Sequence, residues 1–321
     1  MYNLRRLEIL RELRHRGTLA AVAAALSYSP SAVSQQLSQL EREVGAPLLE
    51  PHGRRVRLTP QAEILVAHTE AVLRRLDRAA ADIAASLAEV TGSLRIAGFQ
   101  TAALALLPPA LSWLRETHPG VRLTFTQAEP DTALPALLAR DCDLVVDEVF
   151  PGRPQARAAE VEHRTLWRDP MRLATREPAE LAALAGRPWA MEPVGTPARE
   201  WTTAVCREAG FEPDVAFESA DMLVHAELVA AGHAAAFLPD LLWYDRRPPV
   251  ALRHLAADHH RDVLVTVRSG AAEHPLVQAV LAALTAAADA ARAAVRQHLG
   301  QGGSPPCDAQ DTRRPAPDAG R

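Results

Sequence analysis

Short hydrogen-bonding side chains gather in one segment near the N-terminus, residues 29–44. A helical period over this segment puts Val33, Leu37 and Leu40 on one side and leaves serine, glutamine and one arginine on the other. The outward side consists of Ser31, Ser34, Gln35, Ser38, Gln39 and Arg42. Glutamine can form two hydrogen bonds with the edge of an adenine, and serine can reach a base or a phosphate. This side therefore predicts the reading of base pairs in a DNA groove, although serine- and glutamine-rich faces also occur on ordinary solvated helices.

Arginine side chains follow this segment in the stretch RRVRLT, residues 54–59. Alternation along a strand turns Arg55 and Arg57 outward, and Arg54 precedes them. Residues 1–60 hold nine arginines and five acidic residues, whereas the whole chain has a formal net charge of −4. A basic N-terminal region on an acidic remainder indicates that this region meets an anion, and double-stranded DNA is the obvious one.

Two further helices and a hairpin are needed to hold the polar segment in place. Residues 3–16 repeat leucine every three residues, which predicts an amphipathic helix. Thr18 is a suitable N-cap for a second helix, and a three-residue turn separates that helix from the third. Ser29 and Pro30 then start the polar helix as its N-cap and its first residue. Two helices joined by a short turn and followed by a basic hairpin predict a winged helix-turn-helix domain over residues 1–59.

A long helix, expected from residue 60 to about residue 90, connects this domain to the rest of the chain. Its apolar side chains form a loose seam of Leu65, Val72, Leu76, Ile83, Leu87 and Val90. A helix of this length with such a seam suits pairing with a second copy of the chain. The sequence Thr91-Gly92-Ser93 marks a domain boundary, so we assign residues 60–91 to a linker that dimerises.

Residues 92–300 alternate between strand-like and helical patterns. Such alternation predicts βα units and mainly parallel sheets, and about 200 residues of it can form two small sheets with a cleft between them. We expect one lobe to consist of about residues 92–167 plus 269–300, and the other of about residues 168–268. Residues 301–321 are polar and rich in proline and glycine, so we expect a disordered tail there.

The N-terminal segment carries a specific motif, GTLAAVAAALSYSPSAVSQQLSQLEREVGAPLLEPHGRRVRLTPQAE, at residues 17–63. This motif closely resembles the LysR-type transcriptional regulators. The later stretches GSLRIAG and AAGHAAAFLP are similar to parts of the family's effector domain, so the resemblance covers about residues 1–300. One departure concerns the reading of bases. Ser29-Pro30-Ser31 stands where the family usually has Ser-Gln-Pro, so Ser31 or Gln35 takes over from the missing glutamine.

The resemblance implies an α/β fold class with an N-terminal winged helix-turn-helix, a long linker helix and a two-lobed α/β effector domain resembling type 2 periplasmic binding proteins. It implies a sequence-specific transcriptional regulator that is controlled by a small-molecule effector, whose identity the sequence leaves open. The expected DNA-binding residues are Ser29, Ser31, Ser34, Gln35, Gln39, Arg54, Arg55 and Arg57. The linker helix would join two chains into a homodimer, the lobes could pair dimers into a homotetramer, and RNA polymerase is a further expected partner.

The resemblance also points to residues that line the cleft between the lobes. These residues lie near the starts of three expected helices: Phe99, Gln100, Thr101, Pro193, Gly195, Thr196, Ser219 and Met222. A helix that begins near Gln100 or Thr101 would turn backbone N–H groups toward the cleft, which offers a site for an anion. Asp147 and Glu148, just past the end of a strand, would instead favour a cationic group.

Catalytic, metal and redox chemistry find less support. The sequence contains no GxSxG, HExxH, P-loop or GxGxxG motif, so we do not expect an enzyme. His254, His259 and His260 lack a metal-binding spacing. Cys142 and Cys206 are not spaced like the cysteine pair of the peroxide-sensing family members. We therefore expect no metal, no cofactor and no redox switch.

Two alternatives to an effector-controlled regulator stay open. One is an architectural DNA-binding protein that senses nothing, and the other is a solute-binding protein built on residues 93–300. The second would need an export signal, but the N-terminus has no apolar stretch of that kind. No apolar run approaches about 18–20 residues without charge, so we expect no membrane span and a cytoplasmic location.

Overall fold

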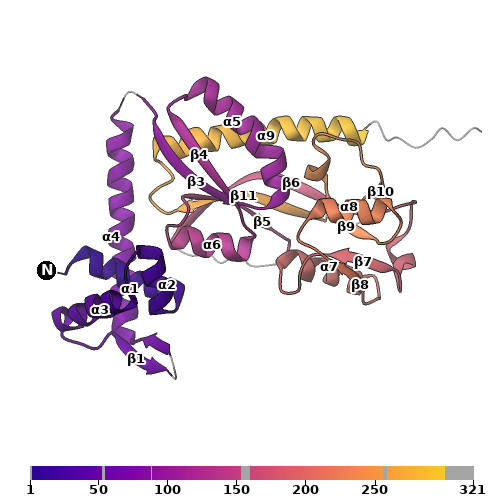
Figure 1. Ribbon diagram of the computed structural model, residues 1–321. Helices are drawn as coiled ribbons and strands as arrows, with labels where there is room; N and C mark the ends of the chain where they lie inside the picture. The colour runs from indigo at the N-terminus through magenta and orange to yellow at the C-terminus, as the bar shows by residue number, and fades with distance from the viewer. Residues whose placement is uncertain (1, 53–54, 88, 153–159, 256–258, 301–321) are drawn as a thin grey trace, which may run out of the picture.

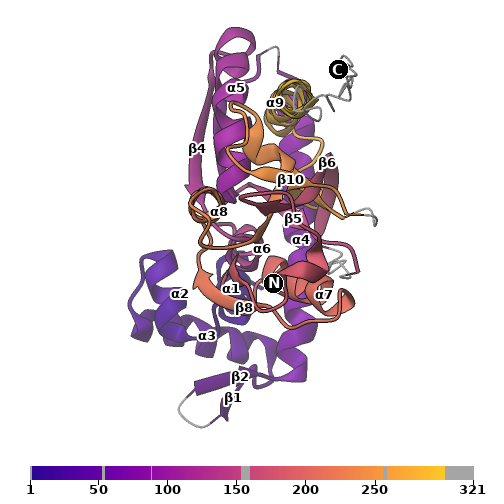
Figure 2. The same cartoon turned by 90° about the vertical axis from the view of Figure 1, so that its right-hand side faces the viewer.

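The computed structural model describes residues 2–52, 55–87, 89–152, 160–255 and 259–300. Figure 1 shows a small helical domain, the long helix α4 (Pro60–Ala85) that rises from it, and a larger α/β domain beside both. In Figures 1 and 2, the hairpin of β1 (Leu49–His52) and β2 (Arg55–Leu58) lies at the opposite end of the molecule from helix α9 (Pro275–Gly300).

Three short helices form the N-terminal domain and begin and end where the sequence predicts. They are α1 (Leu4–Arg16), α2 (Leu19–Leu26) and α3 (Pro30–Val44). The hydroxyl of Ser29 accepts a hydrogen bond from the N–H of Ala32 at 3.1 Å and so caps α3. Gly45 ends α3 at φ 75°, a left-handed conformation that glycine adopts without steric cost. The predicted capping residues therefore fix both ends of this helix.

Apolar side chains from all three helices form one core beneath α3. Val33, Leu37 and Leu40 of α3 are no more than 1% exposed. The hairpin completes the domain, with Leu49 opposite Leu58 in an antiparallel register. Because the apolar side of α3 is buried, its serine and glutamine side must face outward, as a winged helix-turn-helix requires.

Helix α4 ends at Ala85, earlier than the residue 90 expected from the sequence. The chain turns here because Ser86 bonds back to the helix, with its hydroxyl donating to the carbonyl of Ile83 at 2.6 Å. The two ends of the apolar seam that was expected on this helix are covered. Leu65 packs on the N-terminal core, and Val90 packs on the core of the α/β domain. Between them the large apolar side chains are 46–66% exposed, namely Val72, Leu76, Ile83 and Leu87. The single chain thus leaves most of this seam uncovered.

The α/β domain begins directly after the linker. Its elements are β3 (Gly92–Gly98), α5 (Gln100–Thr117), β4 (Val121–Gln127), α6 (Pro130–Leu138), β5 (Leu144–Val149), β6 (Val161–Thr175), β7 (Pro188–Met191), α7 (Pro197–Glu208), β8 (Asp214–Glu218), α8 (Met222–Ala230), β9 (Ala236–Pro239), β10 (Ala251–Arg253), β11 (His260–Arg268) and α9, with short 3-10 turns at Leu181–Leu184 and Asp240–Trp243. One sheet has the order β10-β6-β11-β5-β3-β4 with β9 beside β6, and β7 pairs with β8.

Two long strands, β6 and β11, carry the chain between two lobes (Figure 1). Strand β3 is parallel to β4 and β5, as predicted, but β11 runs antiparallel to both β5 and β6. The expectation of mainly parallel sheets is therefore wrong for the connecting strands, because a chain that crosses to the second lobe and returns must reverse direction. Strand β11 pairs with β5 over Asp262–Val267, so the chain is back in the first lobe by about residue 260, earlier than the residue 269 expected.

Helix α9 covers the first lobe beside α5. By length and composition alone it could cross a membrane, and it is the one helix in the described part of the chain that passes this test. Its apolar side is buried in the core of the first lobe, where Val280, Leu281 and Leu284 are no more than 4% exposed. Packing against the sheet and α5 therefore accounts for the apolar character of this helix.

A buried arginine joins the N-terminal domain to the first lobe of the same chain. The sequence does not indicate this contact. Arg11 of α1 is 2% exposed. Its guanidinium bonds to the carboxylate of Glu70 on α4 and to the backbone carbonyl of Leu138 at the end of α6. Nearby, Arg16 donates to the carboxylate of Asp141 at 2.7 Å. The two domains therefore meet through charged hydrogen bonds at the C-terminal half of α1.

Candidate functional site

The outward side of α3 carries the side chains that are predicted to read DNA. Ser31, Ser34 and Gln35 are exposed, in line with their expected placement. The hydroxyl groups of Ser29 and Ser31 are 2.9 Å apart, and Ser29 also caps the helix. Among the described residues, no hydrogen bond holds the side chain of Gln35. Its amide can therefore turn both its donor and its acceptor toward a base pair.

Gln39, one turn further along α3, is half-buried and already engaged. Its side-chain carbonyl accepts hydrogen bonds from Arg42 at 2.5 and 3.2 Å. Its amide nitrogen donates to Glu43 at 3.4 Å. A contact between Gln39 and a base therefore requires the exchange of these bonds for bonds to DNA.

The hairpin carries the arginines that are predicted to contact phosphate. Arg57 is exposed, and its Nε donates to the carboxylate of Glu50 on the partner strand at 2.7 Å. Glu50 and a phosphate would therefore compete for Arg57. The backbone of Arg55 pairs with that of His52 in the hairpin register. Arg54 lies outside the described residues, so its phosphate contact stays a prediction.

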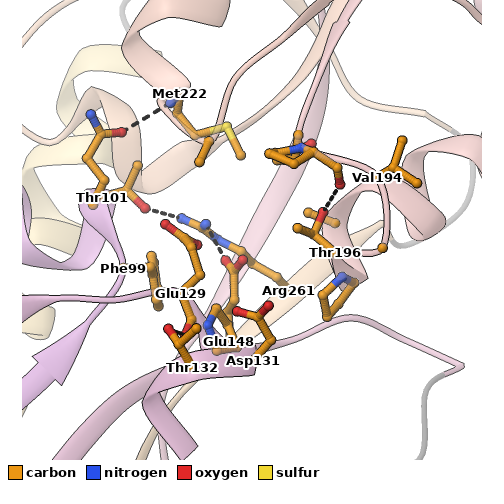
Figure 3. Close-up of a pocket in the computed structure, with 18 residues that line it drawn as sticks. Phe99, Thr101, Glu129, Asp131, Thr132, Glu148, Val194, Thr196, Met222 and Arg261 are labelled. Atoms are coloured by element: carbon orange, nitrogen blue, oxygen red, sulfur yellow. Dashed lines mark hydrogen bonds and ion pairs between the residues drawn. The ribbon is translucent and has the colours of Figure 1, made fainter.

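A cavity of about 460 Å³ lies between the two lobes (Figure 3), within the size range of small-ligand sites. Seven of the eight residues that were expected in the cleft line it: Phe99, Gln100, Thr101, Pro193, Gly195, Thr196 and Met222. Ser219 is the exception. Its hydroxyl accepts a hydrogen bond from the N–H of Asp221 at 3.0 Å, and its neighbour Ala220 lines the cavity instead.

Arg261 on β11 also lines the cavity, although the sequence gives no indication of it. This side chain is 1% exposed and donates to Glu148 at 2.6 Å, to Asp169 at 2.9 Å and to the hydroxyl of Thr101 at 2.7 Å. The guanidinium also lies 4.9 Å from the centre of the Phe99 ring. Two carboxylates thus face one guanidinium, which leaves no surplus positive charge for a bound anion.

Three further carboxyl groups line the cavity, those of Glu129, Asp131 and Glu192. Burial raises the pKa of Glu129 to about 7, and the nearby carboxylate of Glu148 raises it in the same direction. Burial likewise raises the pKa of Glu192 to about 7. Asp147, expected here beside Glu148, does not line the cavity, because its carboxylate turns to the N–H of Glu148 at 2.7 Å. The wall is therefore acidic through Glu148, as expected, and through Glu129, Asp131 and Glu192, which the sequence did not indicate.

Side chains of the protein occupy the N-termini of α8 and α7 at the cavity, whereas the N-terminus of α5, where the sequence predicts an anion site, has no side-chain cap. The side-chain oxygen of Gln100 accepts from the N–H of Met222, the first residue of α8, at 3.1 Å. Its amide nitrogen donates to Asp221 at 2.5 Å. The hydroxyl of Thr196 caps α7 by accepting from the N–H of Arg199 at 3.2 Å. An anion at these positions would have to displace bonds that the chain already makes, and Gln100 in addition joins the first lobe to the second.

The cysteines of the described chain are buried in different lobes. Cys142 belongs to a core of the first lobe and Cys206 to a core of the second. Burial raises the pKa of Cys142 to about 11 and that of Cys206 to about 12, so both thiols stay protonated at neutral pH. Within the described ranges, no group of three or more histidine, cysteine, aspartate or glutamate residues could hold a metal ion.

Family models match both parts of the chain. The model described as "Bacterial regulatory helix-turn-helix protein, lysR family" matches residues 4–63, which contain α1 to α3 and the hairpin. The model described as "LysR substrate binding domain" matches residues 87–289, which contain both lobes and the cavity.

Relatives and solved structures agree with these matches. The transcriptional dual regulator GltC of Bacillus subtilis is 28% identical over 254 residues, which cover 76% of this chain and 83% of GltC. The probable HTH-type transcriptional regulator LrrA of Synechococcus elongatus is 29% identical over 309 residues, 91% of this chain and 99% of LrrA. A full-length OxyR variant from Pseudomonas aeruginosa shares the fold with a TM-score of 0.63 at 20% identity, over 91% of this chain and 95% of that one.

Proposed function

Because the chain belongs to the LysR family of DNA-binding transcriptional regulators, which carry a C-terminal effector-binding domain, we propose that α3 reads its operator through Ser31, Ser34 and Gln35. The observation that carries this proposal is the exposed polar side of α3, where the Gln35 amide has no hydrogen-bond partner among the described residues. Such an amide can pair with adenine, and each good bidentate pair discriminates by about 1–3 kcal/mol.

The remaining expected residues would hold the domain on the duplex. Ser29 and Gln39 flank the three reading residues on α3, and the arginines of the hairpin, Arg54, Arg55 and Arg57, would contact phosphates. Phosphate contacts position a protein on DNA but carry no base information. The protein would act in the cytoplasm, where it meets chromosomal DNA.

The exposed seam of α4 would pair two chains. Val72, Leu76 and Ile83 are about half exposed or more, and burial of such a stripe against a second copy is favourable. In this proposal residues 1–59 bind DNA, residues 60–91 pair two chains, and residues 92–300 bind the effector. A two-fold dimer places two α3 helices on two half-sites, so the operator would be partly symmetric. Pairing of the lobes into a tetramer and contact with RNA polymerase are further steps in the same proposal.

A small-molecule effector would bind in the cavity between the lobes. A ligand that contacts both Thr101 in the first lobe and Thr196 in the second favours one separation of the lobes. It shifts the conformational balance only by its difference in affinity for the two states. Because Arg11 and Arg16 tie the N-terminal domain to the first lobe, a movement of that lobe is carried to α3.

A footprint of the purified protein on the DNA beside its own gene tests the proposal. Salt of ~150 mM is needed because DNA affinity depends steeply on ionic strength. We expect a bounded protected region that survives competitor DNA. Diffuse protection that disappears with competitor would contradict sequence-specific regulation.

Two glutamine variants localise the reading function. Gln35→Ala should weaken or erase the footprint at low protein concentration. Gln127→Ala is the matched control, because Gln127 is also exposed but lies at the end of β4 in the effector domain. Equal footprints for both variants would show that Gln35 does not contact a base.

A further inference from the structure

Charge in the inter-lobe cavity is not balanced by the protein itself. The lining contains four carboxyl groups, Glu129, Asp131, Glu148 and Glu192, but one guanidinium, that of Arg261. Arg261 is committed to Glu148 and, behind the wall, to Asp169. The other three carboxyl groups therefore face the cavity without a basic partner among the described residues.

Glu192 shows the imbalance most clearly. This residue directly follows β7, is 8% exposed and lines the cavity. Among the described residues, the hydrogen bond that its carboxyl group receives comes from its own N–H. A carboxylate in such a place is costly, so the group holds its proton up to about pH 7 unless a partner of opposite charge arrives. The side chain is therefore built for a partner that enters from the cavity.

The acidic groups belong to both lobes. Glu129 is the N-cap of α6 in the first lobe, and Glu192 lies in the second lobe. Glu129 is close enough for its negative charge, together with that of Glu148, to raise the pKa of Glu192. Figure 3 shows Glu129, Glu148 and Asp131 around Arg261 on one side of the cavity, with Val194 and Thr196 across from them. A cation between Glu129 and Glu192 would relieve their repulsion and contact both lobes at once.

Apolar side chains complete the wall. Phe99 stands in the first lobe, and Val194, Pro197 and Met222 in the second. Such a mixture of apolar walls and a few fixed charges suits a small organic molecule rather than a hydrated ion. No group of acidic, histidine or cysteine residues in the described chain has the arrangement of a metal site.

We propose that the effector is a small organic cation with one or two amine or guanidine groups, held by Glu192 from the second lobe and by Glu129 from the first. The proposal rests on the proposed function of the cavity and names the chemical class of its ligand. An anion is disfavoured because Arg261 is already paired and because Gln100 and Thr196 occupy the N-termini of α8 and α7. The N-terminus of α5 has no side-chain cap, but it opens on the same cavity as four carboxyl groups.

Thermal unfolding of the full-length protein with two matched probes tests this assignment. Cadaverine and pimelate share a chain of five methylene groups but carry two ammonium and two carboxylate groups, respectively. Agmatine supplies a guanidinium in place of one ammonium. Because a ligand that binds the folded state raises the melting temperature by mass action, we expect a rise with cadaverine or agmatine and none with pimelate.

Isosteric variants show whether the rise comes from this cavity. Glu192→Gln and Glu129→Gln each remove one negative charge and should lower the apparent affinity for the diamine at least about tenfold. Glu116→Gln is the matched control, because Glu116 is exposed on α5 and does not line the cavity. Its affinity should equal that of the unsubstituted protein.

The pH dependence gives a second readout. Cadaverine stays fully charged near neutral pH, whereas Glu129 and Glu192 have a pKa of about 7. The other charged groups that face them, Asp131, Glu148 and Arg261, line the same cavity. Binding of a cation should therefore release protons and be tighter at about pH 8 than at about pH 6.

Four results would overturn the assignment: a larger rise with pimelate than with cadaverine, no rise with either cation, an unchanged cadaverine affinity in Glu192→Gln, and an equal rise with Mg²⁺. The same preparations are used for the footprint. A bounded footprint without any response to cations counts against the ligand class alone, whereas loss of the footprint in the unsubstituted protein counts against the proposed function.

Discussion

The outward side of α3 and the cavity between the lobes are built in opposite ways. The side of α3 is open and carries little charge, with Arg42 beside serines and glutamines, and it is contained in fifteen consecutive residues between two caps. The cavity is a partly open, acidic cleft, and its wall is assembled from segments between Phe99 and Arg261. Uncharged hydrogen-bonding side chains suit a DNA groove, because the phosphate backbone of the DNA already attracts arginine. Buried carboxyl groups without a basic partner suit a ligand that carries positive charge. Under the two proposals, the same chain would select one ligand by its pattern of hydrogen-bonding groups and the other by its charge.

The largest expected effect comes from the cavity wall. Arg261→Met should lower the free energy of unfolding by about 3–5 kcal/mol, because it leaves the buried carboxylates of Asp169 and Glu148 without their partner. Arg57→Met breaks an exposed pair with Glu50 and should cost less than about 1 kcal/mol. Urea unfolding followed by circular dichroism measures both variants. Similar losses of unfolding free energy in both variants would show that the buried ion pairs of Arg261 contribute no more to stability than the exposed pair of Arg57.

The outward side of α3 should respond in affinity rather than in stability. Gln35→Ala should lose about 1–3 kcal/mol of binding on the true operator and relax base preference at one position. Its free energy of unfolding should stay unchanged, since the side chain is exposed. Titration of operator and unrelated DNA in parallel measures the effect. An equal loss on both DNAs would assign Gln35 to phosphate instead.

Acidity of the cavity should appear in the pH dependence of stability. Glu129 and Glu192 have a pKa of about 7 in the folded chain, above the ordinary glutamate value of about 4.3. The folded state therefore keeps protons that the unfolded chain has released, and the free energy of unfolding should fall as pH rises from about 4.5 to about 7. Glu192→Gln should flatten this fall in urea titrations at several pH values. The Gln35→Ala protein should keep the full dependence of its free energy of unfolding on pH. An equal flattening in both variants would show that the dependence does not come from the cavity.

The smallest expected effect is electrostatic and belongs to the hairpin. Arg55→Ala should weaken binding to all DNA and lower the slope of log affinity against log salt by about one unit. Glu192→Gln should leave that slope unchanged. Affinities measured at several salt concentrations decide the matter, and an unchanged slope for Arg55→Ala would show that this residue does not touch phosphate.

The N-terminal domain could be predicted closely because its signals are local. Ser29, Pro30 and Gly45 mark the ends of α3 within the helix itself. The period of Val33 and Leu37 fixes which side is buried. The cleft residues were instead expected from the family resemblance, and seven of those eight line the cavity.

Long-range contacts account for what the sequence could not supply. Arg261 meets Glu148 and Asp169 because β11 lies between β5 and β6, and nothing near residue 261 in the sequence indicates that pairing. Glu129 and Glu192 come from different lobes, so their proximity depends on the whole fold. The antiparallel pairing of β6 and β11 could not be predicted for the same reason. A sequence that alternates strands and helices has the same pattern whether or not the chain crosses to a second lobe and comes back.

The contact between Arg11 on α1 and the first lobe has a consequence for recombination between related genes. On the first lobe Arg11 bonds to the backbone carbonyl of Leu138, a group that every residue provides. That part of the contact therefore tolerates any side chain at position 138, although the contact of Arg16 needs the carboxylate of Asp141. A foreign sensing domain with an acidic residue at the position of Asp141 could be grafted behind this reading domain and keep the connection, so new signals can be coupled to an old operator by domain exchange.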